Sequence, residues 1–128
     1  MMKIAAAMFA VLLAGCSGSH SPTEPKDSTV AVAFGHSVTV PGSMTTISFT
    51  DIADSRCPQS VVCVWEGDAA VRLESAGTTV VLHTSRGAGP SAARLGEITI
   101  TLLDVKPAPV TTDVIKKSDY VATLRLTH

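Results

Sequence analysis

The residues best suited to chemistry gather in one stretch, residues 54–67, which begins Asp-Ser-Arg-Cys-Pro and ends Cys-Val-Trp-Glu-Gly. Cys57 and Cys63 form a Cys-X5-Cys pair, and the only tryptophan, Trp65, follows two residues later. A redox couple usually needs Cys-X-X-Cys at a helix N-terminus, where the thiolate pKa is lowered, and this spacing differs. We therefore expect a structural disulfide. Because the closed loop is short, the bond should add at most about 2 kcal/mol of stability.

A metal site is a second possibility for the same region. Its candidate ligands are Asp51, Asp54, Glu66, Asp68, His36 and His83. Their spacing matches no known metal-binding loop, such as the calcium-binding dodecad. We predict neither a metal nor another cofactor. We expect Asp54 to cap a turn, Arg56 to pair with a carboxylate, and Glu66 and Asp68 to be solvated.

Catalysis by a nucleophile is not indicated either. No general base lies at a sequence spacing from Ser60 that would indicate a catalytic pair, and the residues around His83 match no catalytic-triad motif. We predict no catalytic residue and no enzymatic activity. Trp65 and Cys63 point the same way on an extended backbone, so the indole is expected to pack on the disulfide. An exposed indole would instead be an anchor for a partner.

The rest of the stretch is a candidate recognition loop. Its members are Arg56, Gln59, Ser60, Trp65 and Glu66. If these side chains are exposed and their substitution leaves stability unchanged, the loop recognises a partner. If they are buried and paired, the loop is only a structural staple.

The N-terminus reads as a targeting segment. Lys3 precedes an apolar run too short to span a bilayer, and Leu13-Ala14-Gly15-Cys16 resembles the lipobox of bacterial lipoproteins. That resemblance implies a signal peptide over residues 1–15 and acylation of Cys16, which would hold the protein on the membrane. Residues 16–28 read as the lipidated cysteine and a flexible tether, whose extended length is about 40 Å. Ser17 after Cys16 favours the outer membrane, facing the periplasm.

Composition and periodicity predict the domain that follows the tether. The chain has 128 residues, 45% hydrophobic and 16% charged, which predicts one packed domain over residues 29–128. A net charge of -1 offers no general attraction to nucleic acid. Period-two alternation predicts strands, and no long amphipathic helix is indicated. The predicted strands cover residues 29–34, 37–40, 45–50, 68–74, 78–84, 97–105 and 120–126. We expect the first three of these strands to pair antiparallel with one another.

Turn signals separate these strands. Pro41-Gly42 predicts a type II turn, residues 86–94 read as a loop, and a parity reversal predicts a bulge near Leu102. The fold class is therefore all-β, a single antiparallel sandwich or a small barrel, which alternate in the same way.

The signature Asp54-Ser-Arg-Cys-Pro58, then Cys63-x-Trp65-x-Gly67, resembles that of a group of small bacterial lipoproteins. The resemblance implies anchoring and a single β-rich domain and supplies no catalytic residue. We expect a non-enzymatic envelope lipoprotein, anchored through Cys16, with a recognition or structural role and an envelope protein as partner. The alternatives are an inhibitor of an envelope enzyme such as a lysozyme, and a metal-binding envelope protein.

Overall fold

The structure is a computed structural model that describes Gly15 and residues 27–128. The predicted lipidation of Cys16 and the predicted signal peptide and tether lie almost entirely outside these residues. The first strand begins at Asp27, two residues before the predicted start of the domain. No helix in the described part of the chain is long and apolar enough to cross a membrane.

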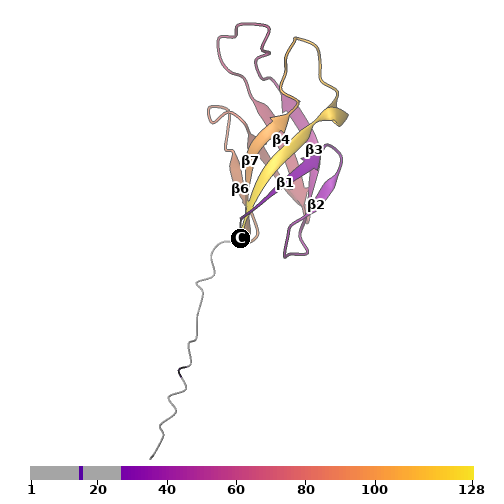
Figure 1. Cartoon of the computed structure of the whole chain (residues 1–128), viewed down its shortest axis with the longest axis vertical. Coiled ribbons are helices and arrows are strands. Elements are labelled where there is room, and N and C mark those ends of the chain that lie inside the picture. Colours follow the sequence, from indigo (N-terminus) through magenta and orange to yellow (C-terminus); the bar gives the residue numbers. More distant parts are fainter. Residues whose placement is uncertain (1–14, 16–26) are drawn as a thin grey trace, which may run out of the picture.

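Two four-stranded antiparallel sheets pack face to face (Figure 1). One sheet has the order β1-β8-β7-β6 and the other the order β2-β3-β4-β5. The strands are β1 (Asp27–Ala33), β2 (Ser37–Thr39), β3 (Thr46–Asp54), β4 (Ala69–Ser75), β5 (Thr78–His83), β6 (Ala92–Leu95), β7 (Ile98–Lys106) and β8 (Val121–Thr127). A 3-10 helix, η1 (Lys117–Asp119), precedes β8. The predicted all-β class is confirmed, and the fold is a sandwich.

The core lies between the sheets because each strand turns its alternate apolar side chains inward. Phe34 and Phe49 meet edge to face across it, with ring centroids 5.4 Å apart. The largest fully buried side chains are Val32, Val40, Ile47, Phe49, Val71, Leu73, Leu82, Ile100, Val105, Leu124 and Leu126.

Local turn chemistry explains several strand ends. Ala76 and Gly77 both have positive φ, 48° and 79°, which is the backbone of the type I′ turn that joins β4 to β5. The predicted bulge is confirmed, because the β7–β8 register shifts between Leu102 and Asp104. It lets Leu102 and Val105 both face the core.

Three predictions about the strands were wrong. Residues 92–95 form β6, although the preceding glycines and proline indicated a loop throughout. β1 pairs with β8 and not with the strands that follow it. β3 continues beyond residue 50 to Asp54, so it delivers the carboxylate of Asp54 to the very end of its sheet.

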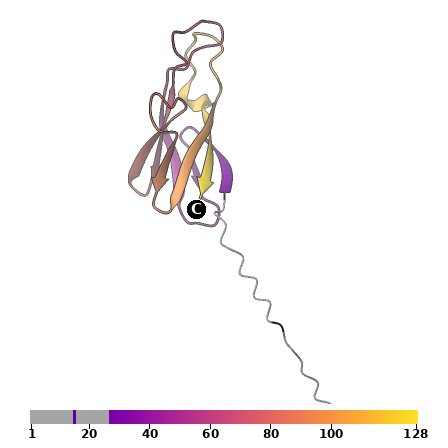
Figure 2. The same cartoon turned by 90° about the vertical axis from the view of Figure 1, so that its left-hand side faces the viewer.

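Two connections project from one end of the sandwich (Figures 1 and 2). We call residues 55–68, between β3 and β4, the first tip loop, and residues 107–116, between β7 and η1, the second tip loop. Asp27, where the domain begins, pairs with Thr127 at the opposite end. The tip loops therefore lie at the far end of the domain from the point where the preceding chain enters it.

Candidate functional site

The predicted disulfide is confirmed. Cys57 and Cys63 are bonded, with their Cα atoms 6.0 Å apart. The amide of Cys57 also donates to the carbonyl of Glu66 at 3.0 Å, so both arms of the first tip loop are tied together. The loop is thus held at its base by a covalent bond and a backbone hydrogen bond.

Arg56 fastens this loop to the other sheet. Its Nε and Nη2 donate to the two carboxylate oxygens of Asp54, each at 2.9 Å. Nη1 donates to the carbonyl of Val105 at 2.7 Å, and Nη2 also donates to the carbonyl of Pro107 at 2.8 Å. The guanidinium fork matches a carboxylate and two carbonyls at once, which an ammonium group cannot do.

Burial confirms that this pair is structural. The side chains of Arg56 and Asp54 are only 15% and 10% exposed. The pairing of Arg56 with a carboxylate is as predicted, and Asp54 also caps the turn by accepting from the Arg56 amide at 3.1 Å. The exposure expected of Arg56 as a recognition residue is wrong. Arg56 positions the loop.

Tyr120, the residue between η1 and β8, completes the network. Its hydroxyl donates to Asp54 Oδ2 at 2.7 Å. Burial alone would raise the pKa of Asp54, but the hydrogen bonds from Arg56 and Tyr120 outweigh it and the pKa is lowered. Burial and the bond to the Asp54 carboxylate raise the pKa of Tyr120 to about 12. Asp54 is therefore ionised and Tyr120 protonated at neutral pH.

A second network holds the other arm of the loop. Asp68 is buried, and its Oδ2 lies 2.7 Å from Nδ1 of His83 while Oδ1 accepts from the amide of Ser85 at 2.9 Å. Burial acts to raise the pKa of Asp68, but these bonds lower it overall. The expectation that Asp68 is solvated is wrong, because His83 and Ser85 approach it from the end of β5.

Serine, histidine and aspartate therefore meet here without the connectivity of a hydrolase triad. The Ser85 hydroxyl donates to Glu66 Oε1 at 2.9 Å. A triad would require that hydroxyl to face the second nitrogen of His83. The cluster orients Glu66 at the edge of the first tip loop.

Gly67 lets the two arms of the loop come together. Its φ is +74°, and a Cβ at this position would collide with the carbonyl oxygen of Ser55. The close approach allows the Ser55 amide to donate to the carbonyl of Asp68 at 2.7 Å. A residue with a side chain would be strained here by both its backbone and its neighbour.

Beyond this fastened base, the tip exposes apolar side chains to solvent. Relative exposure is 103% for Val62 and 107% for Val64, and Trp65 is 56% exposed. The indole is therefore largely exposed, which is the alternative predicted for an anchor that contacts a partner. Gln59, Ser60 and Glu66 are exposed, as a recognition loop requires.

Sequence reasoning missed the second tip loop. The amides of Gln59 and Ser60 donate to the carbonyls of Pro109 and Val110, at 3.1 and 2.9 Å, so the two loops are joined. Val110 and Val114 are also exposed, at 57% and 96%. The sequence did contain an indication of this loop. Val110 and Val114 lie in a segment without strand periodicity, so their apolar side chains have no sheet face against which to pack.

A shallow hollow of about 320 Å³ lies beside the joined loops. Arg56, Glu66, Ser85 and Pro109 are among its walls. The side chains of Arg56 and Ser85 already donate hydrogen bonds to other groups of the protein. Within residues 27–128, no three His, Cys, Asp or Glu side chains are grouped to hold a metal ion.

Comparison with protein-family models, curated proteins and solved structures finds no match to this chain.

Proposed function

We propose that this protein is a lipid-anchored bacterial envelope protein that recognises a partner through its first tip loop, without catalysing a reaction. One observation carries the proposal. Val62, Val64 and Trp65 stand in solvent on a loop whose base is fixed by a disulfide and a buried Arg56 network. Apolar side chains kept outside a core mark an interaction surface when they are clustered.

The fastening of the loop supports binding. A loop ordered before association loses little conformational entropy on binding, so more of its contact energy appears as affinity. Tryptophan is also one of the residue types most often found in binding hot spots. Gln59 and Ser60, in the same loop, are exposed polar residues of the kind found at the rim of a protein interface.

The anchor and the tip are complementary in position. If Cys16 carries the lipid, the membrane attachment lies at the Asp27 end of the domain and the tip loops lie at the other end. Such a lipoprotein would present its recognition surface away from its own membrane. Acylation is tested separately, because Cys16→Ser should release the full chain from membranes, and intact mass should show the loss of the acyl groups.

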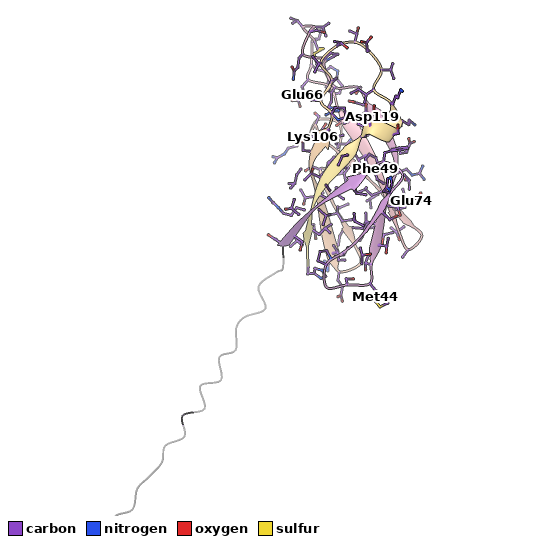
Figure 3. The ribbon with its side chains drawn as sticks, turned by 45° about the vertical axis from the view of Figure 1, so that its right-hand side comes forward. Met44, Phe49, Glu66, Glu74, Lys106 and Asp119 are labelled. Carbon is purple, nitrogen blue, oxygen red and sulfur yellow. A yellow bond between two sulfur atoms is a disulfide. The ribbon has the colours of Figure 1, made fainter. Side chains whose placement is uncertain are left out.

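Position-resolved photocrosslinking tests recognition. The photoreactive residue p-benzoylphenylalanine replaces Val62 in the full chain, and the matched control replaces Met44, which is 98% exposed at the opposite end (Figure 3). Irradiation of cells should give one discrete adduct from position 62 and none from position 44. Equal labelling from both positions, or none from position 62, would refute the proposal.

The projecting shape of the tip favours a second candidate function, inhibition of an envelope enzyme. A convex, fastened loop with an exposed indole fits a cleft better than a flat surface (Figure 2). Hen lysozyme activity, assayed on cell walls against increasing protein, tests this reading for a muramidase. Inhibition at equimolar protein that is lost in Val62→Asp would support it, and full activity at large excess would exclude that enzyme.

A further inference from the structure

The hollow beside the joined loops is lined by residues from three segments of the chain. Arg56, Gln59 and Glu66 come from the first tip loop. Ser85 follows β5, and Pro109 belongs to the second tip loop. The volume of about 320 Å³ lies at the lower end of the range for ligand sites in proteins, which is about 300–1,000 Å³. The hollow therefore suits a single side chain or a similarly small group.

Glu66 is the charged residue of this hollow that has no ionic partner among the described residues. Ser85 is buried, with 4% relative exposure, and its hydroxyl donates to Oε1 of Glu66 at 2.9 Å. No Lys, Arg or His of residues 27–128 forms an ion pair with the carboxylate, and its Oε2 accepts no hydrogen bond from these residues. A buried hydroxyl thus orients the Glu66 carboxylate, whose charge is left uncompensated.

The cation that shares the hollow is already neutralised. Arg56 is paired with both carboxylate oxygens of Asp54 and donates to two backbone carbonyls. The lowered pKa of Asp54 keeps that carboxylate ionised, so it cancels the charge of the guanidinium. Lys106, just before the second tip loop, is not among the residues that line the hollow. The hollow is therefore electrostatically negative because of Glu66.

From this arrangement we infer that the hollow receives the ammonium group of a lysine on the partner protein, with Glu66 as its counter-charge. This inference rests on the proposed recognition function and adds a polar contact to the exposed side chains of the first tip loop. An ammonium group is a compact charge, which one free carboxylate oxygen can accept. A guanidinium fork binds best to two free carboxylate oxygens, and Oε1 of Glu66 already accepts from Ser85.

The same geometry disfavours other occupants of the hollow. An anionic group would be repelled by Glu66. A neutral group would leave the Glu66 charge without a partner once the interface excludes water, which costs free energy. A cation gains in the same step, because the attraction between two opposite charges strengthens as water is removed from around them.

Zero-length crosslinking in isolated envelopes that contain the full chain tests this contact. A carbodiimide joins carboxylates to amines that touch them, so it should link Glu66 to a lysine of the same protein that position 62 labels in photocrosslinking. Tandem mass spectrometry of the adduct identifies both linked residues. Glu97 is an internal control, because it is exposed in the turn before β7, at the opposite end of the domain, and should give no link to that protein.

A charge-removing substitution measures how much the contact contributes. Glu66→Gln keeps the size of the side chain and an oxygen that can accept from Ser85 but removes the charge. It should lower the photocrosslinked fraction from position 62 about tenfold at low salt, and by less at high salt, where the ion pair is screened. The matched control, Glu97→Gln, makes the same change at the other end of the domain and should leave the fraction unchanged.

The outcomes distinguish failure of this inference from failure of the proposed function. A protein adduct from position 62 without a link from Glu66 to a lysine, or with an unchanged yield in Glu66→Gln, would overturn the lysine contact alone. No adduct from position 62 in the parent chain would overturn both proposals. A link from Glu66 to Lys106 of the same chain, or to the amine of a lipid headgroup, would identify a different cation and overturn the inference.

Discussion

Arg56→Ala should destabilise the whole domain, although the residue lies in a loop. The substitution removes four hydrogen bonds that connect the first tip loop to Asp54 at the end of β3 and to the backbone at the end of β7. It also leaves the Asp54 carboxylate, 10% exposed, without its cation. A hydrogen bond to a charged group contributes about 1.5–3 kcal/mol, but the four bonds share one guanidinium and will not add.

The magnitude follows from the charge that is left behind. Breaking a buried ion pair costs about 3–5 kcal/mol, and we expect the lower end because Tyr120 still donates to Asp54. A loss of about 3 kcal/mol lowers a urea midpoint by about 2 M when the m-value is about 1.5 kcal/mol/M. Arg56→Lys keeps the charge but not the fork and should recover only part of this loss.

Urea unfolding followed by circular dichroism measures the effect. Arg86→Ala is the matched control, since Arg86 is exposed and makes no side-chain hydrogen bond within residues 27–128, and should stay within about 0.5 kcal/mol of the parent. A double-mutant cycle with Asp54→Ala should show that the two losses are less than additive. A loss below about 1 kcal/mol for Arg56→Ala would refute the structural role assigned to this residue.

Three further predictions concern the base of the tip. Gly67→Ala should lower the free energy of unfolding by more than about 2 kcal/mol, because the positive φ and the collision with the Ser55 carbonyl act together. Gly35→Ala is the control, since Gly35 also has positive φ but open space around it, and it should lower the free energy of unfolding by less. Equal losses from the two substitutions would argue against the collision. Absorbance at 295 nm should show Tyr120, the only tyrosine, titrating near 12 in the folded protein and nearer 10 in the Asp54→Asn variant. Because folding raises the pKa of Tyr120, its hydrogen bond to Asp54 stabilises the folded state fully below the unfolded pKa of about 10, and this stabilisation is lost as the pH rises toward 12. A Tyr120 titration midpoint near 10 in the folded protein would contradict the buried hydrogen bond. Reduction of the disulfide should cost at most about 2 kcal/mol and leave the β-sheet spectrum intact, and global unfolding would show that the bond matters more than its short loop implies.

Most of the strands were predictable because the residues within each strand indicate it without reference to the rest of the chain. Period-two alternation located seven of the eight strands, and the parity reversal in residues 97–105 located the bulge at Leu102. β6 was missed because four residues that follow glycines and a proline are too few to show a period. The pairing of β1 with β8 joins residues about as far apart as the domain allows, and alternation carries no information on partners.

The site was predictable only in part, for a related physical reason. The disulfide follows from two nearby cysteines, and the Arg56 pair from a carboxylate two residues away. The contacts of Arg56 with Val105 and Pro107 span 49 and 51 residues, and only the assembled sandwich brings those carbonyls within reach. The same holds for the second tip loop, whose role appears when its carbonyls accept from Gln59 and Ser60.

Different parts of the first tip loop contribute to stability and to the proposed recognition. Charged and strongly hydrogen-bonded groups lie at its base, where Asp54, Arg56 and Asp68 are shielded from solvent and tie the loop to both sheets. The uncharged side chains lie beyond the base and contribute little to the core, since Val62 and Val64 are fully exposed. A chain that only needed a stable connection between β3 and β4 would gain nothing from solvated valines and an indole. Substitutions at the base should therefore change stability and recognition together, whereas substitutions of Val62, Val64 or Trp65 should change recognition alone.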